Sequence, residues 1–429
     1  MKKIISIVLI SAFILSFSVL FSSCTIEETD TLYVYNWGEY MADGFDDTED
    51  VNALFEEWYA KKHPGKRIKV NYSTFSSNES MYAKIESGAA AYDVIIPSDY
   101  MIQRMVKEEM LLPLDIEKIP NYANVDDKFK GDNVYYEEER TPDKEDIIYS
   151  VPYFYGMIGI IYNTEMVDEA DAEKQSWDLM FPKDEDMKKK YAKNILQFNN
   201  SRDAFGTALY KLGYDVNEAT PEQWEEARDL LIEQKGVIQG YVMDEIFNKM
   251  SSGSAAIAAY YAGDFFTMYD DNDSLAFYYP KEGTNSYIDA MCIPHNSKNP
   301  DIAHEYINFM CDTEIGMENA LYTYYASPLK TVVEHEDYIY EENGGIGEEA
   351  WEILYGETAS TVKTQAYLNL DEDSLIRLNN LWEELKGKNN LGPGIYICCG
   401  VILATVAVTF TVSAIKKRKR AKYYVEPQK

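Results

Sequence analysis

Apolar and polar positions alternate along this chain in two rhythms, one typical of strands and one typical of helices. Short apolar runs predict strands over residues 32–35, 68–72, 92–96, 158–162, 194–198, 255–261 and 275–279. Apolar residues at helical spacing predict helices over 50–61, 79–87 and 221–234, and a further helix from Met101. Strands and helices that follow one another in turn predict an α/β fold with a parallel sheet.

Polar and aromatic residues come directly after several of the predicted strands. In parallel sheets ligands bind beyond the carboxyl ends of the strands, so these residues predict a binding site. Three alternatives stay open: the aromatic residues fill a core, Asp203 only caps a helix, and Asp264 only ends a strand as an Asx turn. The segments are Tyr35-Asn36-Trp37-Gly38-Glu39-Tyr40, Ser98-Asp99-Tyr100, Asn200-Ser201-Arg202-Asp203 and Tyr261-Ala262-Gly263-Asp264.

The chain is strongly acidic, which narrows the classes of ligand. It has 429 residues, enough for two domains or lobes, and a formal net charge of −33. Nucleic acid is excluded as a partner because its phosphates would be repelled. Aromatic faces and carboxylates are the groups that hold an organic cation. The acids that follow strands, Glu39, Asp203 and Asp264, therefore favour a cationic ligand over an anion.

Cysteine and histidine form no metal motif in the sequence. The four histidines and five cysteines show no clustered spacing, so we expect neither a metal nor a cofactor. Cys292 and Cys311 are the cysteines of the soluble part. We expect them to be free buried thiols, with a bridge between them as the alternative.

The N-terminus has the features of a secretion signal. Lys2 and Lys3 precede an apolar stretch over 4–21, and small residues precede Cys24. We therefore expect a signal peptide over 1–23 and a tether over 24–30. The residues before Cys24 are similar to the bacterial lipoprotein box, although Phe21 departs from it. This similarity predicts a lipidated Cys24, with an ordinary signal or an uncleaved anchor as the alternative.

The C-terminus carries a second apolar segment. Residues 395–415 contain no charged side chain, and as a helix they would be about 31 Å long, enough for a bilayer. We expect a linker over 387–394, a transmembrane helix over 395–415 and a basic tail over 416–429. By the positive-inside rule that tail is cytoplasmic. The large middle part would then lie at the extracytoplasmic face of the bacterial membrane, in contact with membrane lipid.

Four motifs occur in order along the chain: the segment 35–40 given above, Asn78-Glu79-Ser80-Met81-Tyr82-Ala83-Lys84, Tyr92-Asp93-Val94-Ile95-Ile96-Pro97-Ser98 and Pro280-Lys281-Glu282-Gly283-Thr284. Together they resemble the spermidine/putrescine-binding proteins of ABC transporters, over about residues 31–386. The resemblance implies a two-lobed periplasmic-binding-protein fold whose hinge closes an interlobe cleft on the ligand. It implies lobe 1 over 31–155 and 264–313, and lobe 2 over 156–263 and 314–386.

The resemblance also implies which residues bind the ligand. Trp37, Glu39 and Tyr40 map onto the family's aromatic-acid motif, with Glu39 taking an ammonium group and the two rings lining the methylenes. Asn200 stands where the family has a carboxylate, and Asp203 is one methylene shorter than the family's Glu, which leaves the number of bound amines open. The implied set is Trp37, Glu39, Tyr40, Ser98, Asp99, Tyr100, Asp203, Tyr241, Asp244, Tyr261, Asp264, Tyr287, Asp289 and Tyr325.

The function implied by the resemblance is delivery of a polyamine, spermidine or putrescine, to an ABC importer. Its partners would be the permease and ATPase subunits, and we expect the binding protein to be a monomer. Two other readings stay open: a membrane-tethered sensor of the same fold, and a binder of another small organic cation. An enzyme with paired carboxylates is disfavoured because the sequence shows no nucleophile elbow, metal motif or catalytic Cys/His pair.

Overall fold

A computed structural model describes residues 28–45, 48–130 and 147–387 of the chain. Residues up to Leu378 form one compact unit, and a second unit begins at Asn379. The first unit contains every strand of the described ranges and is the part discussed below. Cys24 and the predicted basic tail lie outside the described residues.

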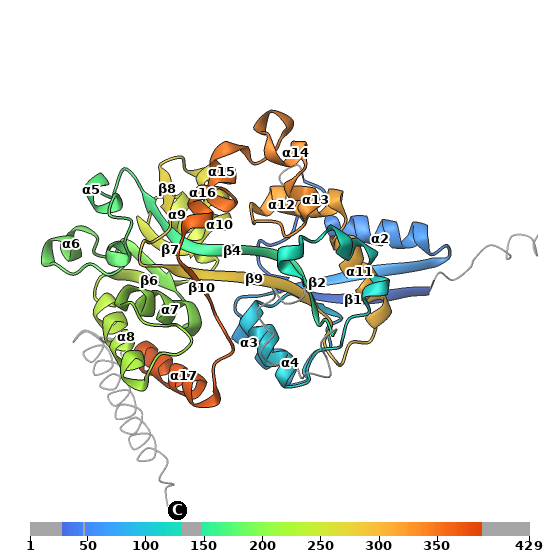
Figure 1. Ribbon diagram of the computed structural model, residues 1–429, viewed down its shortest axis with the longest axis horizontal. Helices are drawn as coiled ribbons and strands as arrows, with labels where there is room; N and C mark the ends of the chain where they lie inside the picture. The colour runs from blue at the N-terminus through green and yellow to red at the C-terminus, as the bar shows by residue number, and fades with distance from the viewer. Residues whose placement is uncertain (1–27, 46–47, 131–146, 388–429) are drawn as a thin grey trace, which may run out of the picture. The chain divides into compact units, whose positions relative to one another are not determined.

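Ten strands of the described chain belong to one sheet path, in the order β2-β1-β3-β9-β4-β7-β5-β6, with β10 paired to β9 and β8 paired to β4 (Figure 1). They are β1 Glu28–Trp37, β2 Lys66–Phe75, β3 Val94–Ile95, β4 Ser150–Asn163, β5 Ile195–Phe198, β6 Ile238–Val242, β7 Ile257–Tyr261, β8 Leu275–Tyr278, β9 Thr284–Cys292 and β10 Thr364–Ala366.

Helices connect and cover these strands, as the alternating pattern predicts. They are α2 Val51–Lys62, α3 Asn78–Glu86, α4 Asp99–Lys107, α5 Glu169–Ala172, α6 Glu185–Lys190, α7 Ser201–Leu212, α8 Pro221–Gln234, α9 Glu245–Ser251, α10 Ala262–Asp271, α11 Pro300–Met310, α12 Thr313–Thr323, α13 Lys330–Val333, α14 Glu336–Ile339, α15 Gly347–Leu354, α16 Glu357–Thr361 and α17 Glu372–Gly387.

The helix ends follow local capping chemistry. At the start of α8, Thr220 and Gln223 form a capping box and Pro221 occupies the first turn, where its missing N–H costs nothing. Helix α7 starts at the Asn200 cap and ends at Gly213, whose left-handed backbone (φ 77°) closes the last turn. These capping residues determine where α7 and α8 begin. The first turn of α7 faces the site described below.

Parallel pairing is confirmed for β1 with β2 and β3, and for β5 with β6 and β7. The sheet as a whole is mixed, however, because β9 runs antiparallel to both β3 and β4, and β4 runs antiparallel to β7 and β8. The prediction of a parallel sheet was therefore wrong for these strands. One cause is β9, the antiparallel neighbour of β3 and β4, whose mixture of polar and apolar residues did not predict a strand.

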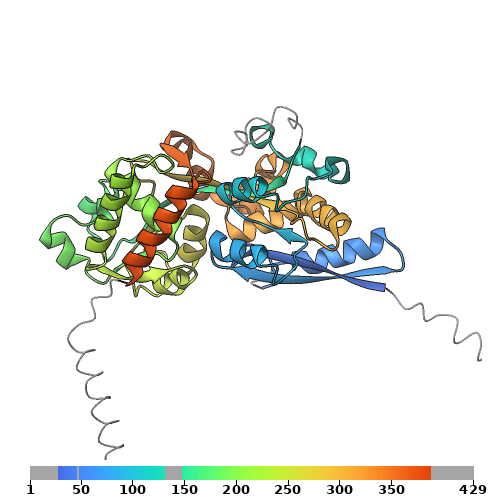
Figure 2. The same cartoon turned by 90° about the horizontal axis from the view of Figure 1, so that it is seen from below.

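Strands β4 and β9 join two halves of this unit, which gives the two-lobed α/β fold (Figure 1). The first half of β4, Ser150–Met157, pairs with β9, and its second half, Ile158–Asn163, pairs with β7 and β8. Figure 2 shows the blue and cyan elements in one lobe and the green elements in the other. The lobes are therefore linked by continuous, hydrogen-bonded strands. The lobe boundaries given above stay a prediction.

A buried core under β3 fixes the loops of the N-terminal lobe. Ile95 of β3 is fully buried among apolar side chains of α3 and α4, including Met81, Ile85 and Met101. Burying such side chains stabilises the fold by about 1.5–3 kcal/mol each. Because α3 and α4 are held in this way, the turns that lead into them present their polar side chains in fixed positions.

The predicted C-terminal transmembrane helix is corrected by the structure. Among the helices of residues 28–45, 48–130 and 147–387, none is both long enough and apolar enough to cross a membrane. The segment 395–415, to which that prediction referred, lies outside the described residues. Cys292 and Cys311 are buried and free, as expected.

Candidate functional site

A cavity forms where the carboxyl ends of the parallel strands meet, the position that the sequence predicted. Residues that follow β1, β2, β3, β5, β6 and β7 reach it, together with β9 and the segments after α12 and β10. Its lining residues are Trp37, Gly38, Tyr40, Ser76, Ser77, Asn78, Glu79, Ser98, Asp99, Tyr100, Asn200, Asp203, Met243, Asp244, Phe247, Tyr260, Tyr261, Asp264, Asn285, Tyr287, Asp289, Tyr325 and Tyr367.

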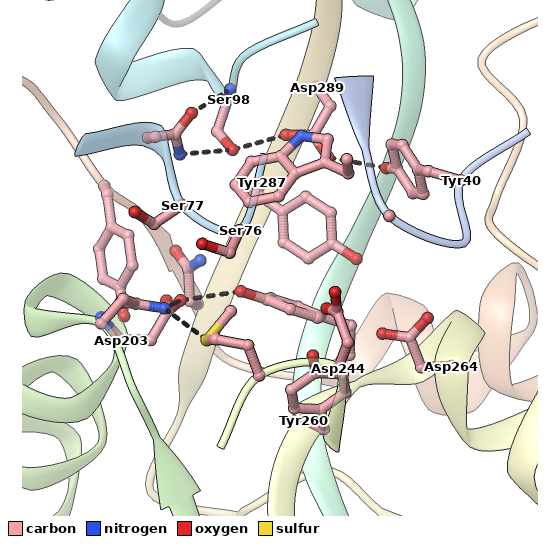
Figure 3. Close-up of a pocket in the computed structure, with 18 of the residues that line it drawn as sticks. Tyr40, Ser76, Ser77, Ser98, Asp203, Asp244, Tyr260, Asp264, Tyr287 and Asp289 are labelled. Carbon is pink, nitrogen blue, oxygen red and sulfur yellow. Dashed lines mark hydrogen bonds between the residues drawn. The ribbon is translucent and has the colours of Figure 1, made fainter. Parts of the chain in front are cut away.

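One wall is organised around the carboxylate of Asp289. The Tyr40 hydroxyl donates to Asp289 Oδ2 at 2.7 Å, and Ser98 Oγ donates to Asp289 Oδ1 at 2.6 Å. Asn78 Nδ2 in turn donates to Ser98 Oγ at 3.0 Å. Figure 3 shows this group on one side of the cavity, opposite the group that contains Asp203, Asp244 and Asp264. Within the described ranges, the donors to the Asp289 carboxylate are therefore both hydroxyl groups.

On the opposite wall, Asp203 lies in the first turn of α7. The helix cap is Asn200, whose Oδ1 accepts from Asp203 N at 2.8 Å, so capping does not occupy the Asp203 carboxylate. That carboxylate accepts from the Tyr261 hydroxyl at 2.8 Å and from Asn200 Nδ2 at 2.7 Å. Arg202 turns elsewhere and donates to the carbonyl of Val216 at 2.9 Å.

Asp264 lies in the first turn of α10 and accepts from the Tyr325 hydroxyl at 2.8 Å. Gly263 makes this contact possible, since a Cβ there would come 2.5 Å from the Tyr325 ring. The Tyr325 ring meets the Tyr40 ring edge to face at 4.6 Å. Aromatic rings thus form the wall that lies between the carboxylates of Asp264 and Asp289.

Two further acids come from the N-terminal lobe. Glu79, in the first turn of α3, accepts from the Tyr100 hydroxyl at 2.8 Å. Asp99 accepts from the backbone N–H groups of Tyr100 at 2.7 Å and Ile288 at 3.3 Å. Asp99 therefore serves chiefly to join α4 to β9, while Glu79 faces the cavity with one hydroxyl donor.

The charges of the cavity do not balance. Six acidic side chains line it, and its lining residues within the described chain include no Lys, Arg or His. Burial raises the pKa of Asp264 to about 8, with repulsion by Asp244 and Glu39 opposed by the Tyr325 hydrogen bond. Burial also raises the pKa of Asp289 to about 6, against the hydrogen bonds of Ser98 and Tyr40. Burial raises the pKa values of Glu79 and Asp203 as well. A cation would stabilise all of these carboxylates.

Comparison with known proteins identifies the family. The profile of the bacterial extracellular solute-binding proteins matches residues 55–345. The chain belongs to this family. It is 30% identical to the spermidine/putrescine-binding periplasmic protein of Salmonella typhimurium, over 81% of this chain and 94% of that protein.

Two solved structures share the fold at similar identity. A candidate spermidine/putrescine ABC transporter protein from Listeria monocytogenes is 33% identical, with a TM-score of 0.70, over 83% of this chain and 98% of that chain. The substrate-binding protein PotD of the spermidine/putrescine ABC transporter from Streptococcus pneumoniae is 30% identical, with a TM-score of 0.61, over 83% and 98%. Membership makes this chain a bacterial extracellular solute-binding protein.

Most residues of the predicted site line the cavity of this solute-binding protein. Two do not: Glu39 is exposed, on a left-handed backbone with φ 48°, and Tyr241 lies outside the lining. In the segment 35–40, Tyr35 belongs to the core, where it stacks on Tyr92 at 4.3 Å. Those that line the cavity are Trp37, Tyr40, Ser98, Asp99, Tyr100, Asp203, Asp244, Tyr261, Asp264, Tyr287, Asp289 and Tyr325.

Several lining residues were not predicted from the sequence. Glu79 was quoted in a motif but was not recognised as a cavity acid, although it directly follows a strand and a serine-rich turn. Asn285 Oδ1 is buried at the cavity without a hydrogen-bond partner in the described chain, so it can accept a hydrogen bond from a ligand. Tyr367 follows β10, a short strand that no pattern indicated.

Proposed function

We propose that this protein is the extracytoplasmic substrate-binding component of an ABC importer and that its substrate is a polyamine. One observation carries the proposal: buried carboxylates converge on a cavity whose described lining contains no basic side chain. Burying a carboxylate without a counter-charge is costly, so such a cavity is arranged for a ligand that brings the positive charge.

The carboxylates define where the ammonium groups would lie. We assign one ammonium group to Asp264, whose carboxylate retains free acceptor sites beside the Tyr325 hydroxyl. A second is assigned to Asp289, opposite the first across the Tyr40 and Tyr325 rings. The Asp203 carboxylate would bind a third ammonium group, that of an inner amine of the ligand. Glu39 is left at the exposed rim.

The energies suit this assignment. A hydrogen bond to a charged group contributes about 1.5–3 kcal/mol net, and a desolvated cation over an aromatic ring adds about 2 kcal/mol. Two carboxylates with their rings would reach micromolar affinity, about −8 kcal/mol, after the ordering of the ligand is subtracted. The methylenes between the amines would lie against the rings of the cavity wall, including Trp37 and Tyr261.

The relatives support the same substrate class, since their names give spermidine and putrescine. The partners of an importer component would be the permease and ATPase subunits, and we propose that the protein binds its ligand as a monomer. From the sequence we further propose export by the signal over 1–23 and lipidation of Cys24.

Calorimetry of the purified protein tests the proposal. Putrescine and spermidine should bind with micromolar dissociation constants at neutral pH, whereas a neutral sugar and an amino-acid anion should not bind. Binding of the sugar or anion with no heat from any polyamine would overturn the proposal.

A further inference from the structure

A short segment late in the chain touches both lobes beside the cavity. It comprises residues 364–369, that is, β10 and the residues after it, and we call it the strap. Strand β10 pairs with the first residues of β9. The strap then passes between α7, in the lobe with the green elements, and the region of α3 and α4, in the lobe with the blue and cyan elements (Figure 1). Its Tyr367 lines the cavity.

Asn217 and Arg202 attach the strap to the lobe that contains α7. Asn217 Nδ2 donates to the carbonyl of Ala366 at 2.9 Å, and Asn217 Oδ1 accepts from Leu368 N at 2.9 Å. Arg202 Nη2 donates to the carbonyl of Leu368 at 3.3 Å. The Arg202 guanidinium also lies 4.4 Å from the centre of the Tyr367 ring. Backbone and side chain of the strap are thus both held by this lobe.

Gly206, in the interior of α7, lets the strap come this close. Glycine destabilises a helix interior, so its presence there needs a reason. A Cβ at Gly206 would collide with the Tyr367 hydroxyl. The glycine therefore gives Tyr367 its place between α7 and the cavity.

From the other lobe, Gln103 of α4 holds the end of the strap. Its Oε1 accepts from Asn369 N at 2.7 Å. Gln103 is only 6% exposed, and a buried amide is costly unless it is hydrogen-bonded, so this contact contributes to its satisfaction. The Tyr100 ring, also on α4, meets the Tyr367 ring edge to face at 6.1 Å.

These contacts between the lobes lie next to the ligand site. Tyr100 lines the cavity from α4, and Tyr367 lines it from the strap. A ligand that touches both rings draws α4 and the strap together. When the lobes separate, the strap stays with α7, and the hydrogen bond between Gln103 and Asn369 is broken. This hydrogen bond therefore belongs to the closed arrangement of the lobes.

We propose that Gln103 is a positioning residue that acts through the strap: its hydrogen bond to Asn369 N fastens the lobes in the closed arrangement and slows release of the ligand. The proposal rests on the proposed function, since it needs a ligand between Tyr100 and Tyr367. Gln103 does not line the cavity, so it acts on closure and not by contact with the ligand.

Two variants of the full chain break this hydrogen bond from opposite sides. Gln103→Met removes the acceptor and keeps a side chain of similar length, whereas Asn369→Pro removes the N–H donor and leaves α4 unchanged. Each should raise the dissociation rate constant of spermidine by about threefold to tenfold, the effect of one hydrogen bond. The association rate constant should change by less than about twofold. Stopped-flow tryptophan fluorescence measures both rate constants.

Two matched controls keep the hydrogen bond. Gln103→Glu retains an oxygen that can accept from Asn369 N, and Asn369→Ala retains the N–H group. Both should release spermidine at the rate of the unmodified protein. Unchanged release in Gln103→Met and Asn369→Pro would overturn the proposal, and so would faster release that the two controls share.

A second measurement needs no ligand. Spin labels on non-natural amino acids, which spare the native cysteines, would replace the exposed Glu57 on α2 and Glu225 on α8, one in each lobe. In the ligand-free protein, Gln103→Met and Asn369→Pro should shift the distance between the labels to larger values, and the controls should not. The same distances in all variants would overturn the role of the strap. If spermidine and putrescine did not bind the unmodified protein, the proposed function would fail instead, while the label distances would still test the strap.

Discussion

Two groups of acidic side chains in this protein differ in the partners that compensate their negative charge. Near the β8–β9 connection, Asp178 and Glu282 surround Lys211, whose Nζ lies 2.7 Å from Asp178 Oδ1 and 3.5 Å from Glu282 Oε1. Lys211 has only 7% of its side chain exposed. In the cavity, Asp264 and Asp289 have tyrosine and serine hydroxyls as their partners instead.

The pKa values of Asp178 and Asp264 are shifted in opposite directions because the two carboxylates have different partners. Partial burial alone would raise the pKa of Asp178, but the hydrogen bond and charge of Lys211 outweigh burial and lower it. Burial raises the pKa of Asp264 to about 8, and no basic residue of the described chain opposes this shift. The first group is complete without a ligand, so its role is structural. The second group has no basic side chain beside it within the described chain, which supports its proposed role as the binding site.

The largest expected effect comes from Asp264→Asn. This variant should weaken putrescine and spermidine binding by roughly 100-fold, since a hydrogen bond to a charged group contributes about 1.5–3 kcal/mol. Without ligand, the variant should melt at the same temperature as the unmodified protein or higher, because a buried acid has been removed. Calorimetry and thermal melts measure the two quantities.

Tyr325→Phe is the matched control, because it removes the donor to Asp264 and keeps both the ring and the charge. It should weaken binding by less than about tenfold. Unchanged affinity in Asp264→Asn would show that this carboxylate does not meet the ligand.

Lys211→Met tests the other group. Its partners Asp178 and Glu282 are 35% and 22% exposed, so the loss lies between those of a surface pair and a buried pair, about 2 kcal/mol of unfolding free energy. Polyamine affinity should stay the same. Denaturant unfolding measures the loss, with Lys118→Met, at a more exposed pair with Asp301, as the control. A loss of affinity without a loss of stability would reverse the assignment of the two groups.

Proton release on binding is expected near neutral pH. Below its pKa of about 8 the ligand-free Asp264 carries a proton, which an ammonium ligand displaces. Affinity should therefore rise by roughly tenfold for each pH unit from 6 to 8, while the amines of the ligand remain charged. Calorimetry in buffers of different ionisation enthalpy counts the protons, and Asp264→Asn should release one fewer.

The stability of the ligand-free protein should change with pH in the opposite direction. The folded state binds the Asp264 proton more tightly than the unfolded state, whose carboxyl pKa is about 4. This contribution is therefore fully present below about pH 4 and is lost as pH rises to about 8. Melting temperatures across that range measure the loss, and a slope that persists in Asp264→Asn would contradict its origin.

The smallest effect is expected for Glu39→Gln. Glu39 is exposed and does not line the cavity, so removing its charge should change polyamine affinity by less than about threefold. A loss as large as that of Asp264→Asn would place Glu39 on the ligand, as the family motif implies.

The sequence predicted the strands that are local and apolar, and it failed where a strand depends on distant partners. The runs 32–35, 68–72 and 158–162 lie within β1, β2 and β4. Strand β9 was missed because polar residues such as Asp289 and Asn285 interrupt its apolar pattern. Those residues are polar because they face the ligand cavity, so the site itself hides the strand.

The predicted site shows the same limit. Residues directly after predicted strands, such as Trp37, Asp203 and Asp264, reach the cavity because parallel strands end at a common edge. Glu39 shows that a side chain two positions beyond Trp37 can point to solvent on a left-handed turn. Tyr367 comes from a segment far along the chain, and its approach depends on long-range folding that no local pattern encodes.

The position of β9 has a consequence for biosynthesis. This strand lies between β3 and β4, so the N-terminal segment cannot complete its sheet until residue 292 has been made. A nascent chain of the first 280 residues carries β3 and β4 without the strand that joins them. Such late closure gives a high contact order and slow folding. A chain that folds slowly stays unfolded long enough to be translocated, which suits a protein that works outside the cytoplasm.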